Sequence, residues 1–208
     1  MADDGRALSI AKVLSDTFGA GAGAAVLGKG VYTPRQILGM EDMGGSALEA
    51  FSTMSVFHSY AAQGAEVLVD LDTGAVRVLR VVAADDVGRA INPRNCAQQL
   101  EGAISMGLGF CLSEEYVWDR GMILNANFRD YTLATALDSP KVKVFLIETV
   151  HPQGPFGAKG VGEIANSPTA PAIANAIYNA CGVRIRDLPL RPEKILRELQ
   201  MAKGSGIQ

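Results

Sequence analysis

The sequence predicts an α+β protein in which a mixed β-sheet has helices packed beside it. Apolar and polar residues alternate over 65–70 and again over 75–83, as in half-buried strands. The DTG sequence at 72–74 between them has the composition of a hairpin turn. Helical spacing then follows from Pro93 to about Glu115. Because hairpins and helices come in mixed order, we expect a mixed sheet rather than a doubly wound parallel one.

Length and composition indicate a globular chain with a rather apolar surface. The 208 residues are 48% apolar and 20% charged, and the formal net charge is -3. This balance argues against a nucleic-acid-binding surface, and no apolar run is long enough to cross a bilayer. The N-terminus lacks the basic-then-apolar order of a signal peptide. We therefore expect a cytoplasmic protein that covers part of its surface with another chain.

The first 53 residues predict a lead-in to the main domain. Three segments make it up: a short helix over 7–18, a strand over 26–32 and a loop over 36–53. Pro34 ends the strand because proline has no N–H donor and biases the preceding residue away from helix. We expect the main α+β body over 54–203 and a frayed tail at 204–208.

Further elements are predicted within the main body. In chain order they are a strand over 55–62, a hairpin of 115–118 with 122–124, a strand over 141–150, a helix from Ser167 to Gly182 and a last helix over 192–199. For the helix near 93–115, Asn92 is a good N-cap and Pro93 a good first residue. Glycines inside a helix cost up to about 1 kcal/mol each relative to alanine. We therefore expect something to pack very close to Gly102, Gly107 and Gly109.

The histidines and cysteines form no metal-binding pattern. His58 lies in the predicted strand 55–62 and His151 lies beside a glycine-rich loop, but neither has a second histidine or cysteine at a ligand spacing. We expect satisfied core or surface histidines, with His151 the better candidate to face a ligand. No iron–sulfur or zinc spacing exists, so small buried hydrophobes are expected at Cys96, Cys111 and Cys181.

The stretch GPFGAKGVGEIANSP at 154–168 is the strongest candidate for a functional site. It places four glycines and one carboxylate, Glu163, between a predicted strand and an alanine-rich helix. Glycines permit backbone angles closed to other residues and let a ligand approach the main chain. No Gly-Lys-Ser/Thr follows, so this is not a phosphate-binding P-loop. The alternative is an ordinary strand-to-helix connection with a surface glutamate.

Gln99 is a second candidate, because it stands among apolar neighbours in the helix predicted from Pro93. Its side-chain amide offers two donors and one acceptor, which suits the amide and amine edge of a fused heterocycle. The alternative is that Gln99 only caps a buried backbone group.

Three stretches together resemble the molybdenum hydroxylases, the xanthine dehydrogenase and aldehyde oxidase family. They are DVGRAINP at 86–93, QLEGAISMGLG at 99–109 and GAKGVGE at 157–163, in the order and spacing of the family. The segment GVYTPR at 30–35 matches the start of the corresponding part of the family's large subunit. The resemblance covers most of the chain. It implies the fold of the C-terminal lobe of the molybdenum cofactor-binding domain over residues 1–208.

The resemblance also implies roles for individual residues. Glu163 falls on the family's catalytic glutamate, a general base, and Gln99 falls on a glutamine that hydrogen-bonds the pterin. Gly162 matches the glycine beside the metal centre. The remaining loop residues expected to contact the cofactor are Ala158, Lys159 and Gly160. The family holds molybdenum through the dithiolene of molybdopterin, expected here in its cytosine dinucleotide form, so no protein side chain should bind the metal.

The implied activity is water-derived hydroxylation of an aldehyde or an N-heterocycle, with Glu163 as base and the redox chemistry supplied by the cofactor. Three cysteines cannot hold an iron–sulfur cluster, so an iron–sulfur subunit and an FAD subunit are expected as partners. Nothing in the chain resembles the N-terminal half of the large subunit, so an N-terminal molybdopterin-binding chain is expected too. Two alternatives stay open: a non-catalytic assembly module, and a free-standing nucleotide-binding domain.

Overall fold

A computed structural model of the chain describes residues 9–18, 29–31 and 57–204. Its contacts divide the chain into two units, 1–33 and 34–208, and each is described by itself. In the first unit, α1 (Ile10–Phe18) confirms the predicted opening helix. Residues 29–31 form no strand, so the strand predicted over 26–32 is wrong where it can be judged. The rest of that strand, the loop 36–53 and the last four residues lie outside the described residues.

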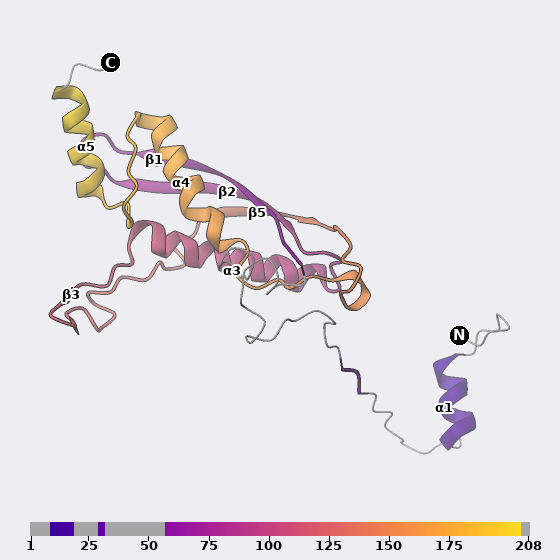
Figure 1. The fold of residues 1–208 in the computed structure, drawn as a ribbon. Helices are drawn as coiled ribbons and strands as arrows, with labels where there is room; N and C mark the ends of the chain where they lie inside the picture. Colours follow the sequence, from indigo (N-terminus) through magenta and orange to yellow (C-terminus); the bar gives the residue numbers. More distant parts are fainter. Residues whose placement is uncertain (1–8, 19–28, 32–56, 205–208) are drawn as a thin grey trace, which may run out of the picture. The chain divides into compact units, whose positions relative to one another are not determined.

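A three-stranded mixed sheet forms the centre of the second unit (Figure 1). Its strands are β1 (Ala61–Val69), β2 (Val76–Asp86) and β5 (Lys141–Ile147), in the order β1-β2-β5. β1 and β2 pair antiparallel, whereas β2 and β5 pair parallel. The predicted α+β class with a mixed sheet is therefore confirmed.

The first strand differs from its prediction. One continuous strand, β1, contains the last two residues of the strand predicted over 55–62 and most of the strand predicted over 65–70. Residues 57–60 are not a strand, and 55–56 lie outside the described residues. Gly64 lies within β1 and does not interrupt it. His58 accordingly lies outside the sheet and is exposed.

The turn between β1 and β2 is held by its own aspartate. The Asp70 Oδ1 atom accepts the backbone N–H groups of Asp72 and Thr73 at 2.9 and 3.1 Å. Gly74 takes a φ of 75°, in the left-handed region that glycine tolerates, and the carbonyl of Pro192 leaves no room for a side chain there. The predicted hairpin turn at 72–74 is confirmed.

Three helices accompany the sheet (Figure 1). They are α3 (Pro93–Leu112), α4 (Asn166–Cys181) and α5 (Pro192–Gly204). The Asn92 side chain caps α3 by accepting the N–H of Asn95 at 3.1 Å, as predicted. Helix α4 ends at Gly182, which takes a φ of 75°. The last helix is longer than predicted and reaches Gly204.

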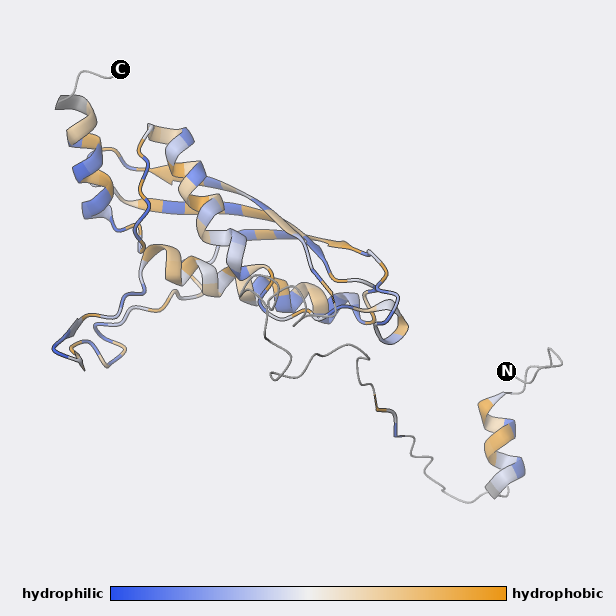
Figure 2. Ribbon diagram, in the orientation of Figure 1, coloured by the Kyte–Doolittle hydropathy of each residue, from blue (hydrophilic) through white to orange (hydrophobic). Residues whose placement is uncertain are grey.

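The hydrophobic core lies between one face of the sheet and the helices α3 and α4. Hydrophilic and hydrophobic residues alternate along the strands, so successive side chains belong to opposite faces of the sheet (Figure 2). Gly107 brings α3 close to α4, since a Cβ there would lie 2.7 Å from the Thr169 Cβ. The expectation of close packing is wrong for Gly102, which has open space. Of the cysteines, Cys111 is buried and the others are half-buried.

A short hairpin projects from the body beyond the end of α3 (Figure 1). It consists of β3 (Trp118–Asp119) and β4 (Met122–Ile123), which turn through Arg120 and Gly121, both with positive φ. The Asn125 side chain closes its base, accepting from the Val117 N–H at 2.9 Å and donating to the Glu115 carbonyl at 2.7 Å. The second predicted hairpin is confirmed with shorter strands.

Candidate functional site

The glycine-rich loop begins after β5 and is fixed to the end of β2 by backbone hydrogen bonds. The short 3-10 helix η2 (Pro155–Gly157) opens it. Gly88 and Ala158 form an antiparallel bridge, and the Lys159 N–H donates to the Val87 carbonyl at 3.0 Å. Gly88 has a φ of 61°, and a Cβ there would lie 2.6 Å from the Lys159 nitrogen. The glycine of the DVG sequence therefore lets the loop approach β2 this closely.

Lys159 ties the same loop to β2 through a buried ion pair. Its Nζ atom lies 2.6 Å from Asp86 Oδ2, and the side chains are 7% and 5% exposed. The ammonium also donates to the carbonyl of His58 at 2.8 Å, while Asp86 Oδ1 accepts the Gly88 N–H at 3.0 Å. Burial alone would raise the pKa of Asp86, but Lys159 and backbone N–H donors outweigh it and lower that pKa. The Lys159 side chain thus has an internal partner, and its predicted contact with a cofactor stays a prediction.

Gln99 and the far end of the loop meet directly. Gln99 lies in the second turn of α3, and its Nε2 donates to the carbonyl of Gly162 at 3.0 Å. Both residues are exposed, and they come from parts of the sequence 63 residues apart. The second donor hydrogen and the Oε1 atom of Gln99 have no partner within the described part of the chain. Gln99 does hold a backbone carbonyl, as in the alternative reading, but that carbonyl belongs to an exposed residue, and contact of Gln99 with a cofactor stays a prediction.

Glu163 and the residues before it present unpaired polar groups. Glu163 is exposed, and within the described ranges its carboxylate makes no ion pair or hydrogen bond. The backbone N–H groups of Gly160, Val161, Gly162 and Glu163 donate to no described acceptor. A Cβ added at Gly162 would meet no described atom within 4 Å, whereas one added at Gly160 would lie 3.1 Å from the ring of Phe57. The end of the loop is thus an open set of hydrogen-bond donors beside one carboxylate.

The first turn of α4 is anchored to the sheet by Gln63. The Nε2 of Gln63 donates to the Ala165 carbonyl at 2.6 Å, and its Oε1 accepts the Thr169 hydroxyl at 2.9 Å. Because Ala165 follows Glu163 by two residues, this clamp fixes the exit of the glycine loop. Sequence reasoning missed both Gln63 and Asp86. The only available signal for Asp86 was its place in the DVG stretch, and Gln63 gave none.

The two histidines differ in their surroundings. His151 packs its ring against Phe57 with the centroids 5.6 Å apart, and its Nε2 is buried without a hydrogen-bond partner among the described residues. His58 contributes its carbonyl to the loop, through Lys159. Among the residues that the structure describes, no three His, Cys, Asp or Glu side chains gather as metal ligands.

Asp85 is a buried carboxyl group that lies next to the ion-paired Asp86 in sequence. It is fully buried on the core face of β2, opposite Ala61 of β1, and neither of its oxygens has a hydrogen-bond partner in the described part of the chain. Burial raises the pKa of Asp85 to about 6. Neighbouring aspartates of one strand therefore have opposite pKa shifts, because one has a cationic partner and the other is buried without one.

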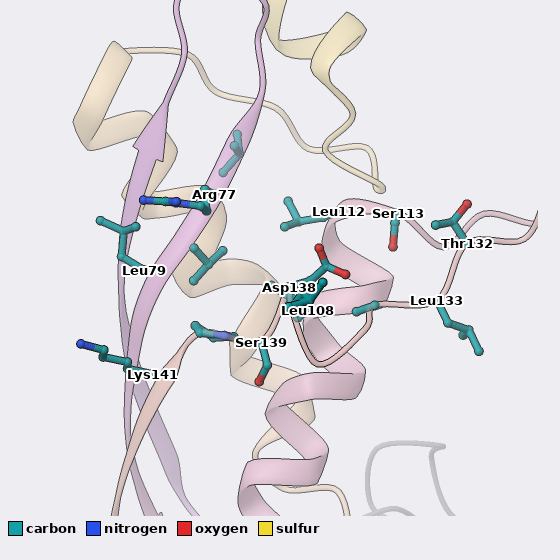
Figure 3. A pocket seen from close by; sticks show the side chains of 15 residues that line it. Arg77, Leu79, Leu108, Leu112, Ser113, Thr132, Leu133, Asp138, Ser139 and Lys141 are labelled. Carbon is teal, nitrogen blue, oxygen red and sulfur yellow. The ribbon is translucent and has the colours of Figure 1, made fainter.

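A pocket of about 480 Å³ lies elsewhere in the fold (Figure 3). It is bounded by the start of β2, the end of α3 around Leu108 and Leu112, and the segment that leads into β5. Asp138 and Ser139 lie beside α3 in this view, whereas Arg77 extends away from it. None of the predicted site residues lines this pocket, so it is separate from the glycine loop.

Comparisons with known proteins match the chain to molybdenum-containing oxidoreductases. A family model described as a molybdopterin cofactor-binding domain matches residues 3–140. The molybdenum-binding subunit of an Escherichia coli K12 aldehyde oxidoreductase is 39% identical over 144 residues, which cover 68% of this chain and 20% of that protein. The gamma subunit of the 6-hydroxypseudooxynicotine dehydrogenase complex of Paenarthrobacter nicotinovorans is 35% identical over 164 residues, with 77% and 21% covered.

A solved structure gives the same result. The aldehyde oxidoreductase from Desulfovibrio gigas superposes with a TM-score of 0.66 at 35% identity, covering 71% of this chain and 16% of that one. The chain spans about a fifth of the length of the curated relatives named above. No helix in the described ranges is both long and apolar enough to cross a membrane.

Proposed function

Since this chain belongs to the molybdopterin cofactor-binding family of the molybdenum hydroxylases, we propose that it supplies the base Glu163 and part of the cofactor cradle of an enzyme that oxidises an aldehyde or an N-heterocycle. The observation that carries the proposal is the hydrogen bond from Gln99 to Gly162. It joins the two predicted cofactor-binding stretches in one place, and the predicted base is the next residue along the chain.

The groups at this place suit molybdopterin. The free amide edge of Gln99 and the unpaired N–H groups of 160–163 are donors for the oxygen-rich and heterocyclic parts of such a cofactor. Gly162 leaves space for it next to the main chain. When bound, the cofactor would supply the two-electron chemistry and hold the metal itself. The cytosine dinucleotide form stays a prediction, as do contacts with Ala158 and Gly160.

Glu163 is suited to take a proton from the reacting oxygen. The loop that carries it is fixed at one end by the Asp86 ion pair and at the other by the Gln63 clamp, so its backbone is held in place. Its carboxylate is free to face a substrate that a further polypeptide would enclose. A positioned general base contributes about 10² to 10⁴ in rate.

We further propose that the chain works in a complex. An additional molybdopterin-binding polypeptide is proposed as one partner, and the proposal is supported by matched relatives that are named as subunits of an oxidoreductase and of a dehydrogenase complex. Iron–sulfur and FAD subunits are proposed as partners that remove the electrons. The alternative, a non-catalytic assembly module, is supported by the exposed apolar side chains of the projecting hairpin, such as Trp118 and Met122.

Glu163→Gln tests the catalytic proposal in the assembled enzyme. We expect normal molybdenum and pterin content, and a reductive half-reaction slower by about 10² to 10⁴, because the amide keeps the size of the side chain but takes no proton. The matched control is Glu193→Gln, an exposed glutamate in the first turn of α5, which should leave the rate unchanged. A fully loaded Glu163→Gln enzyme that is reduced at the wild-type rate would favour the assembly module.

A further inference from the structure

Two side-chain contacts tie the segment that carries Glu163 to α3. Gln99 donates to the carbonyl of Gly162, one residue before the glutamate, at 3.0 Å. Asn166, three residues after the glutamate, donates from its Nδ2 to the Sδ of Met106 at 3.6 Å, within the range of a thioether acceptor. The proposed base therefore lies between two attachments to the same helix.

Both attachments lie along one stripe of α3. Gln99 and Met106 are seven positions apart, which is about two helical turns and roughly 10 Å along the axis. A step of that length returns to almost the same face of a helix. Both side chains are exposed, Met106 to 41%. One exposed stripe of a rigid helix thus holds both ends of the short segment from Gly162 to Asn166.

Asn166 is fitted against α3 by shape as well as by its hydrogen bond. A Cβ added at Gly107 would lie 2.8 Å from the Oδ1 of Asn166 and 2.7 Å from the Cβ of Thr169. Any larger residue at position 107 would therefore displace the Asn166 amide and the first turns of α4. Glycine costs a helix up to about 1 kcal/mol relative to alanine, and here it makes the space into which this amide fits.

The main chain of Asn166 connects its amide to the base. The Asn166 N–H donates to the carbonyl of Glu163 at 3.0 Å, in the turn that opens α4. The carbonyl of Ala165 accepts the Gln63 amide of β1 at 2.6 Å. The peptide groups that follow Glu163 are thus held by α3 and by the sheet, which restricts the directions in which the carboxylate can extend.

We propose that Asn166, held by Met106 and Gly107, is a positioning residue for Glu163. This role rests on the proposed function, in which Glu163 is the base. A general base must lie within hydrogen-bond reach of the proton that it takes, and a misplacement of about 1 Å can cost about 10²-fold in rate. Loss of the Asn166 amide should therefore slow proton transfer without weakening the binding of substrate or cofactor.

Asn166→Ala tests the positioning role in the assembled enzyme. The reductive half-reaction should slow by about 5- to 50-fold per bound molybdenum, whereas the KM and the molybdenum and pterin contents should stay within about twofold of the wild type. The matched control is Asn175→Ala, the same change further along α4, where the side chain accepts from Arg184 at 2.6 Å. It also removes a hydrogen bond of α4 and should leave the rate unchanged.

Met106 provides a test from the other side of the contact. Met106→Leu keeps the size of the side chain but removes the sulfur acceptor, so it should slow the reaction in the same way. Because both changes break one contact, the double variant with Asn166→Ala should be no slower than Asn166→Ala alone. Independently of turnover, the Asn166 amide should exchange its hydrogen faster in both single variants, since its bond to the Glu163 carbonyl is less confined.

Glu163→Gln in the same assay separates the positioning role from the proposed function. If Glu163→Gln slows the reductive half-reaction and Asn166→Ala does not, the positioning role is wrong and the assignment of the base stands. A loss of molybdenum or a rise in KM that accounts for the whole effect of Asn166→Ala would overturn the positioning role too, as would additive effects of the two changes. If Glu163→Gln reacts at the wild-type rate, the base assignment fails and the positioning role fails with it.

Discussion

Replacing Lys159 with methionine should destabilise the chain strongly. The substitution keeps the length of the side chain but leaves Asp86 as a buried carboxylate without its cation. Removing one partner of a buried ion pair costs about 3–5 kcal/mol, a large part of the roughly 5–15 kcal/mol that stabilises a typical domain. We expect a loss of that size in the free energy of unfolding, measured by urea denaturation of the isolated chain at pH 7.

The loss should depend on pH and on Asp86. In the wild type the pKa of Asp86 is lowered, so its stabilising contribution is present above the unfolded value of about 3.9 and is lost as the pH falls through the folded value. Without Lys159 burial dominates, and Asp86 should take up a proton at mildly acidic pH. The cost of Lys159→Met should therefore shrink between about pH 7 and pH 4.5.

A double-mutant cycle separates the pair from its surroundings. Asp86→Asn keeps an acceptor for the Gly88 N–H, so the double variant should cost less than the sum of the single changes by about 0.5–3 kcal/mol. If Lys159→Met lowers the free energy of unfolding by less than about 1 kcal/mol at both pH values, the pair does not stabilise the fold as described, because a buried carboxylate without a cation should cost more.

Three further substitutions test other parts of the fold. Asp85→Asn should stabilise the chain at about pH 8 and much less at about pH 3.5. The pKa of the Asp85 carboxyl is raised from 3.8 to about 6 by burial, so its contribution to stability is full below 3.8 and is lost as the pH rises from there through 6. Parallel urea titrations at the two pH values measure this difference. Gly107→Ala should lower the free energy of unfolding by about 1–3 kcal/mol, because the added methyl group would clash with Thr169. Gly102→Ala has open space and should raise it by up to about 1 kcal/mol through helix propensity, so the melting temperatures of the two variants should lie on opposite sides of the wild-type value. Asn92→Ala should cost about 0.5–2 kcal/mol through the lost cap, with earlier exchange of the first amides of α3 as its signature.

Local signals in the sequence were sufficient for most of the fold. Alternation identified the sheet strands of the main body, and the cap at Asn92 and the stop at Gly182 identified helix ends. The break predicted before Ala65 failed for a physical reason. The polar Gln63 lies at this point, and its amide is paired inside the fold with α4, so the strand runs on through it.

The site was harder to predict because its residues contact partners that lie far away in the sequence. The loop, its glutamate and Gln99 could be selected from composition and resemblance, and the structure brings Gln99 and the loop together. Nothing local in the sequence indicates that Lys159 pairs with Asp86, 73 positions away. Glycine freedom was also overestimated, since only Gly157 of the four loop glycines takes a positive φ.

The parallel pairing of β2 with β5 has a consequence for folding. These neighbours are separated by residues 87–140, so β5 can join the sheet only after a long chain closure, whereas β1 and β2 meet through a tight turn. The bridge between Gly88 and Ala158 spans the same long separation, because Gly88 precedes β5 and Ala158 follows it. We therefore expect the glycine loop to take its shape late in folding. A ligand that binds there would select the complete fold and stabilise it as a whole.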